Sequence, residues 1–409
     1  MQKFFFDKEK KQTDNKEKNS VPVFAHIKDM SKEDDSPIIK IPFPNAHMIA
    51  FGITGSGKTE SVLLPLWINK TSITVIDGKG DENAKMVARI YKPEANFYDM
   101  KSKINPLKGL KKDEILELLK NSLYPKIIST EEAFYQDFAI QALSFVIDYI
   151  ENITFEKLFL SLFRDKMKKL YDTYKTYLSE PEELILSGIV NNTDYASYIS
   201  NFMNKLQPFA LAKNLNYEDS NNIDIKADNW FSLRNIEAEN SFGRMIIEYI
   251  RLVKPRQRDF LMTFAIDEFS DLMFSYFSKI IKEIRGFGIE IALLTQSFSD
   301  ADRFDPTLLD IILNNARNKI FFAQDGLRNE DISRLFGYKV EEVKSRTMET
   351  HGTTMVSSGQ AKDWLVQPSA ISALKPGNAI GKILIGQDLI KCVMRFNNYV
   401  NMNEVLKNV

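Results

Sequence analysis

The chain has 409 residues, enough to bury a large core in one α/β domain with an insertion or in two structural units. Apolar residues make up 44% and charged residues 27%, which excludes an intrinsically disordered chain and a membrane-embedded one. The net charge of −1 argues against diffuse binding to nucleic acid, which needs many phosphate-neutralising cations, but it leaves room for a local basic patch.

The numbers and positions of the cysteine and histidine residues exclude two further classes of protein. The single cysteine, Cys392, excludes an internal disulfide framework and is typical of a reducing, cytoplasmic setting. The three histidines lie far apart, so no zinc site is expected. The sequence has no signal peptide and no apolar run long enough to span a bilayer. We therefore expect any membrane contact to pass through a partner protein.

Residues 1–40 alternate lysine with acidic residues and hold few apolar positions, so they are predicted to form a charged, flexible tail. Phe4, Phe5 and Phe6 are an exception within this tail. We interpret them as a short strand added to the core, with an anchor for a partner as the alternative.

An apolar run from His47 to Phe51 leads into the sequence GITGSGKT, and the apolar spacing of a helix follows from Ser61 to Ile68. Glycines let such a loop turn its N–H groups toward phosphate oxygens, while the lysine adds a positive charge and the threonine hydroxyl binds Mg²⁺. This pattern predicts a P-loop for Mg-ATP, with the binding residues Gly52, Thr54, Gly55, Ser56, Gly57, Lys58 and Thr59.

A β-rich run from Ile73 to Ile76 ends at Asp77, and a helical stretch to Tyr91 completes a βαβ unit, so we expect a mainly parallel sheet. Between Pro106 and about Asn216 the pattern changes to long amphipathic helices, which indicate a helical insertion. One stretch of it carries a basic stripe interleaved with Tyr171 and Tyr174. Its cations are Lys157, Arg164, Lys166, Lys168, Lys169 and Lys175. We favour a solvated helix face over a phosphate-binding surface for this stripe.

The α/β pattern resumes near Trp230, and the run from Phe260 to Ile266 ends in Asp267 and Glu268. Asp267 is expected to orient Mg²⁺ through its water shell, and Glu268 to act as the general base on the attacking water. The adjacent glutamate favours a hydrolysing ATPase over a GTPase or a kinase. The alternative is an acidic helix cap.

Two further residues are candidates because they end elements that follow this pair. Gln296, after the strand from Ile289 to Leu294, is expected to sense the γ-phosphate. Arg285 ends the intervening helix, where a cation also suits the helix dipole. Near the C-terminus, two β-rich runs flank Gly386 and predict a hairpin.

The order of these motifs resembles the cytoplasmic ATPase of type IV secretion coupling proteins, the TraG/TraD group of the FtsK/HerA-like motors, over most of residues 41–400. Arg285, in IRGFGI, stands where that family has its arginine finger, and Gln296, in LLTQS, is similar to its sensor glutamine. Residues 77–81, DGKGD, resemble its Asp-Pro-Lys-Gly-Glu motif with Gly78 in place of the proline, and residues 105–107 resemble its Asn-Pro-Leu.

The resemblance implies a RecA-like P-loop NTPase core, residues 41–106 and 219–409, and an all-α domain, residues 107–218. It also implies ATP and Mg²⁺ as cofactors and a homo-oligomeric, hexameric ring. The expected partners are DNA in the ring channel and a relaxase, relaxosome or secreted protein cargo. We expect a cytoplasmic protein, peripheral to the inner face of the membrane. Most coupling proteins begin with transmembrane helices, and none is found in this sequence.

The resemblance implies an ATP-hydrolysing motor that couples ATP turnover to movement of DNA or a DNA–protein complex, as a soluble conjugative coupling protein. Two other functions fit the same motifs. One is a HerA-like motor for DNA repair or phage defence. The other is a nucleotide-gated receptor that docks cargo and turns over little ATP. The complete set of Lys58, Thr59, Asp267 and Glu268 argues against the receptor.

Overall fold

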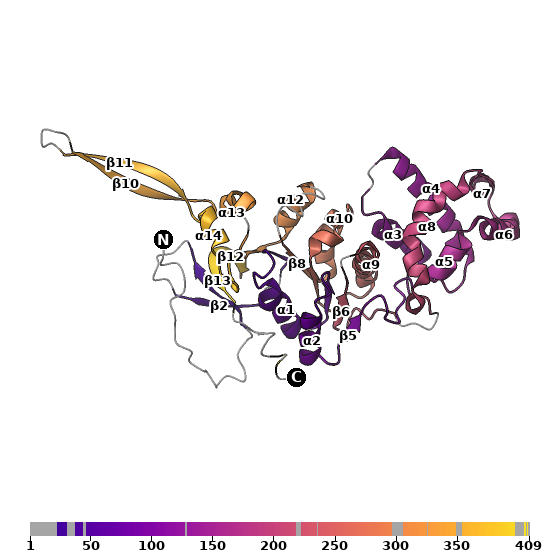
Figure 1. The fold of residues 1–409 in the computed structure, drawn as a ribbon, viewed down its shortest axis with the longest axis horizontal. Helices are drawn as coiled ribbons and strands as arrows, with labels where there is room; N and C mark the ends of the chain where they lie inside the picture. Colours follow the sequence, from indigo (N-terminus) through magenta and orange to yellow (C-terminus); the bar gives the residue numbers. More distant parts are fainter. Residues whose placement is uncertain are drawn as a thin grey trace. The chain divides into compact units, whose positions relative to one another are not determined.

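A computed structural model describes residues 23–30, 37–43, 46–126, 129–217, 222–234, 236–296, 306–324, 326–348 and 354–396, together with residues 405 and 407. The chain divides into two compact units. Unit 1 comprises Met1–Asn69, Leu294–Asp300 and Ala316–Val409, and unit 2 comprises Lys70–Leu293 and Ala301–Asn315. Figure 1 traces the elements of each unit.

Unit 1 contains a sheet in the order β2-β1-β13-β12-β9-β3. Within it β3 and β9 are parallel, and the other neighbours are antiparallel. Aromatic rings fill its core, as in the stacked pair Phe51 and Phe321 with centroids 5.5 Å apart. The strands are β1 (Val23–Asp29), β2 (Ile39–Pro42), β3 (Met48–Phe51), β9 (Asn318–Phe321), β12 (Asn378–Ile385) and β13 (Asp388–Arg395).

The prediction that residues 1–40 form a flexible tail is wrong for Val23–Asp29, which form strand β1. Phe24, Ala25 and Ile27 are buried, and the strand pairs with β2 on one side and β13 on the other. The apolar residues of this short segment supply the burial that offsets the entropy of ordering it, although lysines and acids surround it in the sequence. Phe4, Phe5 and Phe6 lie outside the described residues.

Two hairpins follow in unit 1. The predicted one is confirmed as β12 and β13, joined through Gly386 at a φ of 62°. The other, β10 (Tyr338–Met348) and β11 (Thr354–Trp364), was not predicted, because its sequence is rich in charged and small polar residues. Tyr338 stacks on Trp364 at its base, with ring centroids 4.4 Å apart. The helices of this unit are α1 (Leu64–Asn69), α13 (Asn329–Phe336) and α14 (Pro368–Ser372).

Unit 2 is built on a wholly parallel set of strands in the order β8-β7-β4-β6-β5. The predicted α/β class with a mainly parallel sheet is therefore confirmed. The register places Asp77 at the end of β4 level with Asp267 at the end of β7. The strands are β4 (Ile73–Asp77), β5 (Asn96–Tyr98), β6 (Asn229–Ser232), β7 (Met262–Asp267) and β8 (Ile289–Thr295).

Some helices of unit 2 begin at capping residues that can be read from the sequence. Ser129 and Thr154 cap helices α4 and α5 by accepting backbone N–H groups, and Ser179 forms a capping box with Glu182 at the start of α7. Helix α9 packs against α3. The helices are α2 (Glu82–Tyr91), α3 (Lys112–Leu123), α4 (Thr130–Tyr149), α5 (Phe155–Ser161), α6 (Arg164–Tyr174), α7 (Glu180–Val190), α8 (Tyr195–Leu211), α9 (Glu237–Val253), α10 (Phe277–Glu283) and α12 (Pro306–Asn315).

The described residues between Lys112 and Leu215 are helices and short connections, and they belong to the same compact unit as β4–β8. A separate all-α domain over residues 107–218 stays a prediction. On α6, Met167 and Tyr171 face the core while the neighbouring lysines are exposed. None of the helices in the described ranges is long and apolar enough to cross a bilayer.

Candidate nucleotide site

The loop after β3 has a backbone that only glycine suits at several positions. Gly52 N donates to Thr295 O at 3.2 Å, which fixes the start of the loop. A Cβ on Gly52 would come within 2.7 Å of Phe322 Cβ. Gly55 and Gly57 have φ angles of 79° and 89°, in the left-handed region that side chains disfavour. The predicted glycines are therefore required by the shape of the loop.

Lys58 and Ser56 give this loop its polar interior. Lys58 is 4% exposed, and its Nζ donates to Gly52 O and to Ile53 O, so the ammonium lies over its own loop. Ser56 Oγ is buried and makes no hydrogen bond to any described residue. A buried hydroxyl without a partner is rare in folded proteins. A phosphate oxygen is a suitable acceptor for both groups.

Helical structure begins directly after Lys58, with one turn of π-helix at Thr59–Leu63 followed by α1. The first N–H groups of a helix and its dipole favour bound anions. Thr59 stands at this start, where its hydroxyl suits a hard cation held beside phosphates. The residues of the loop therefore fit a nucleotide triphosphate with Mg²⁺.

Gln296 follows β8 and belongs to the same unit as the loop. Its Oε1 accepts a hydrogen bond of 3.3 Å from Thr54 Oγ1. A second glutamine, Gln324, follows β9 and donates from Nε2 to Gln296 O at 3.1 Å. Gln324 was not predicted. Its signal is the same as that of Gln296, a glutamine shortly after an apolar strand, but β9 was not recognised from the sequence.

In unit 2, the loop of residues 77–81 is wound around the Asp77 carboxylate. This side chain accepts N–H groups from Lys79 at 3.2 Å, Gly80 at 3.0 Å and Asp81 at 2.9 Å. Gly80 completes the turn with a φ of 62°. Burial, and next the charge of Asp267, raise the pKa of Asp77 to about 7.

Asp267 and Glu268 lie at the end of β7, and each is 2% exposed. Glu268 has a φ of 52°, a left-handed conformation that costs a residue other than glycine about 1–3 kcal/mol. Its carboxylate forms an ion pair with Lys79. Burial lowers the pKa of Lys79, but the hydrogen bond and charge of Glu268 outweigh it, so this pKa is raised. The loop motif was recognised from sequence, but this contact was not.

Arg285 lies in the helical turn Ile284–Phe287 that follows α10, and its side chain is exposed. Gly288 ends the turn at a φ of 73°. Arg285 therefore contributes little to the core of its own unit. Lys58 and Gln296 belong to unit 1, whereas Asp267, Glu268 and Arg285 belong to unit 2.

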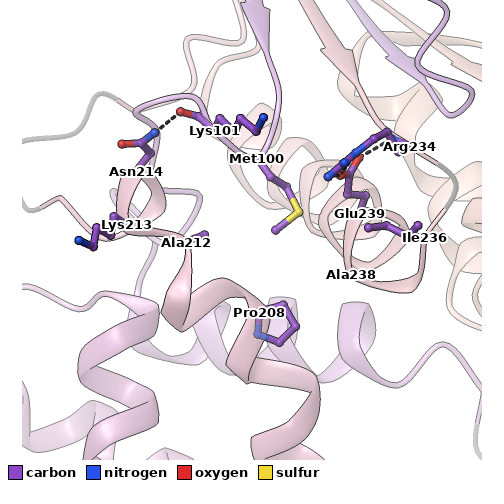
Figure 2. Close-up of a pocket in the computed structure, with 10 residues that line it drawn as sticks. All are labelled: Met100, Lys101, Pro208, Ala212, Lys213, Asn214, Arg234, Ile236, Ala238 and Glu239. Atoms are coloured by element: carbon purple, nitrogen blue, oxygen red, sulfur yellow. Dashed lines mark hydrogen bonds and ion pairs between the residues drawn. The ribbon is translucent and has the colours of Figure 1, made fainter.

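A pocket of about 350 Å³ in unit 2 contains none of the predicted site residues (Figure 2). The ion pair of Arg234 and Glu239 forms one wall, with Arg234 Nε and Glu239 Oε1 2.7 Å apart. Asn214 donates to Lys101 O at the other side. The first contact joins the segment after β6 to the start of α9, and the second joins the turn after α8 to the loop after β5. The remaining lining residues are Met100, Pro208, Ala212, Lys213, Ile236 and Ala238.

Comparison with known proteins gives two kinds of match. Residues 261–376 match the family model described as the TraM recognition site of TraD and TraG. This segment includes Asp267, Glu268, Arg285 and Gln296. No curated protein sequence matches the chain.

The solved structures provide matches to nearly the whole chain. The plasmid coupling protein TrwB in complex with ADP and Mg²⁺ aligns at 14% identity and a TM-score of 0.66, covering 95% of this chain and 99% of TrwB. TrwB in complex with the ATP analogue ADPNP aligns at 13% identity and a TM-score of 0.67, covering 95% of this chain and 92% of TrwB. VirB4 of Thermoanaerobacter pseudethanolicus aligns at 15% identity and a TM-score of 0.52, covering 93% of this chain and 97% of VirB4. The resemblance to the TraG/TraD group and the RecA-like P-loop fold are confirmed.

Replacing Lys58 with alanine is expected to abolish measurable ATP binding without loss of the fold, because it removes the ammonium that the loop encloses. Titration with a fluorescent ATP analogue, alongside thermal unfolding, measures both. Lys85→Ala, which removes a lysine paired with exposed Glu82 on α2, is the control and should bind as the parent does. Undiminished nucleotide affinity in Lys58→Ala would contradict the assignment of the loop.

Proposed function

We propose that this protein is an ATP-hydrolysing motor that moves DNA or a DNA–protein complex. Its fold is similar to that of a plasmid coupling protein, and its residues 261–376 match the TraM recognition site of TraD and TraG. The observation that carries the proposal is the P-loop with its enclosed Lys58 and unpartnered Ser56 hydroxyl, in a chain that also ends β7 in Asp267 and Glu268. A loop of this shape binds phosphates, and an acidic pair at a strand end can supply both a ligand for Mg²⁺ and a general base for water.

Each residue of the set has a role in this proposal. Lys58 and the N–H groups of residues 52–59 hold the phosphates, and Thr59 and Asp267 hold Mg²⁺ directly or through its water shell. When bound, Mg²⁺ offsets charge on the phosphate oxygens. Glu268 accepts a proton from the attacking water, whose oxygen bonds to the γ-phosphorus as the bond to the β-phosphate oxygen breaks. Gln296 senses the γ-phosphate.

We further propose that the working form is a homo-oligomeric ring, of six subunits by resemblance, with DNA in its channel. Arg285 supports this because it is exposed on its own subunit and is therefore available to a neighbour. The match to a TraM recognition segment supports relaxosome components as partners. A membrane-bound partner would dock the ring at the inner face of the membrane.

The direct test is steady-state ATP hydrolysis with and without double-stranded and single-stranded DNA. A motor should hydrolyse ATP faster when DNA is present. A nucleotide-gated receptor should bind ATP with little turnover under either condition, and that result would reject the proposal. Translocation itself is checked by displacement of a triplex-forming strand from a DNA track.

Glu268→Gln is expected to bind ATP but to hydrolyse it at least ~10²-fold more slowly, because glutamine keeps the shape of the side chain and cannot accept the proton. Single-turnover hydrolysis and nucleotide binding measure the two effects separately. Glu290→Gln, which alters a partly exposed acid paired with Lys70, is a matched control and should hydrolyse normally. Parental activity in Glu268→Gln would show that this residue has only a structural role.

Arg285→Ala is expected to bind ATP normally and to lose hydrolysis by ~10³ or more, because an arginine supplied by a neighbour stabilises charge that develops in the transition state. Mixing it with Glu268→Gln creates some interfaces with both groups intact, so the mixture should recover part of the activity. Arg258→Ala, at another exposed arginine of unit 2, is the control. A specific rate that stays constant on dilution to monomer would exclude a shared site.

Changing Lys166, Lys168 and Lys169 to glutamate tests whether the exposed lysines of α6 hold DNA. We expect DNA affinity to be unchanged, because these side chains have the pattern of a solvated helix face. DNA binding measured over a series of salt concentrations gives the affinity and its slope. A large loss of affinity with a shallower slope would instead place phosphate contacts on this helix.

A further inference from the structure

The ion pair between Lys79 and Glu268 joins two loops of unit 2 that are far apart in the sequence. The Glu268 side chain is 3% exposed and that of Lys79 is 34% exposed. An ion pair between two exposed side chains contributes little, but a buried carboxylate has lost its water and depends on the partner that replaces it. The ion pair with Lys79 therefore helps to stabilise the buried Glu268 carboxylate.

The backbone on the lysine side of this pair is held by contacts that do not involve Glu268. Three N–H groups of residues 79–81 donate to Asp77, which fixes the course of the loop. Gly80 is in the left-handed region, and a Cβ there would lie 2.8 Å from Leu233 O. The ammonium is thus presented by a rigid turn, and little conformational entropy is lost when it meets its partner.

The glutamate side is equally constrained. Glu268 has the left-handed φ of 52°, and its N–H donates to Asp267 Oδ1 at 3.1 Å. Gly78 N donates to Asp267 O, which ties the two loops together one residue before each member of the pair. Backbone strain that surrounding contacts maintain is common where a side chain must be aimed.

We propose that Lys79 is a positioning residue for the general base: by pairing with Glu268 it holds the carboxylate in the orientation from which it acts on the attacking water. This inference rests on the proposed ATPase function. A glutamate has three side-chain torsions, and a displacement of about 1 Å of a reacting group can cost ~10² in rate. Lys79 restricts those torsions from a loop that is fixed to β4.

The positive charge of Lys79 is needed because other acidic side chains lie around the ion pair. The negative charges of Asp267 and Asp77 also raise the pKa of the Lys79 ammonium. Removing the cation leaves Glu268 beside acidic neighbours of the same sign, so repulsion as well as freedom of rotation would move its carboxylate. A change at Lys79 should therefore affect the chemical step and leave phosphate binding intact, because Lys79 lies outside the P-loop.

The test is Lys79→Met, which keeps the length of the side chain and removes its charge. We expect kcat to fall at least ~10-fold, with KM for ATP and the Kd for ADPNP unchanged and the midpoint of thermal unfolding near that of the parent. Lys79→Arg, which restores a cation, should recover most of kcat. Lys85→Met is the matched control, because Lys85 pairs with an exposed acid nearby on α2.

A double-mutant cycle then asks whether Lys79 acts through Glu268. In single-turnover assays, Lys79→Met should cause no further loss in the Glu268→Gln background. An equal loss in both backgrounds, a kcat for Lys79→Met within twofold of the parent, an increase in kcat, or a loss confined to Kd would each overturn the inference. A parental protein without ATP hydrolysis would instead reject the proposed function, so the two failures are distinguishable.

Discussion

The register of β4 against β7 is the constraint on which the chemistry of unit 2 depends. It sets Asp77 level with Asp267, so both strands deliver an acidic residue to the same edge of the sheet. Parallel strands end together, and the loops that follow them meet there. A shift of one residue in either strand would turn the side chains of that strand to the opposite face of the sheet. The ion pair of Lys79 and Glu268 and the turn around Asp77 are consequences of this alignment.

Bringing these acids together is costly, and the local structure shows how the cost is offset. Asp77 is surrounded by three N–H donors yet still has a pKa raised to about 7, because burial and the charge of Asp267 outweigh the hydrogen bonds. Lys79 contributes positive charge to the same cluster. A buried acid whose pKa is raised, as that of Asp77 is, is common at functional sites.

Much of this arrangement could be predicted from sequence because the signals are local. The glycines at 52, 55 and 57 are required by the course of the backbone, and Asp267 and Glu268 stand at the end of a mostly apolar strand, so their positions could be predicted from local spacing. Helices α4, α5 and α7 carry the N-cap residues Ser129, Thr154 and Ser179 in the sequence.

What could not be predicted depends on pairing between distant segments. Strand β1 is short and lies among charged residues, and it is stabilised by β2 and β13. The β10–β11 hairpin lacks an apolar alternation. The contact of Lys79 with Glu268 joins residues nearly two hundred positions apart, and no local pattern encodes it.

The glycine that replaces the proline of the coupling-protein loop motif makes a backbone contact beside this ion pair. Gly78 stands where the motif has proline, and its N–H donates to Asp267 O at 3.3 Å, a bond that proline cannot make because it has no N–H. A Cβ at this position would lie 2.8 Å from Asp267 O and 3.3 Å from Glu268 Cβ. Glycine therefore brings the loop of β4 closer to the end of β7 than a residue with a side chain allows. Lys79, the next residue, pairs with Glu268, so the glycine and the ion pair lie at the same close approach of the two loops.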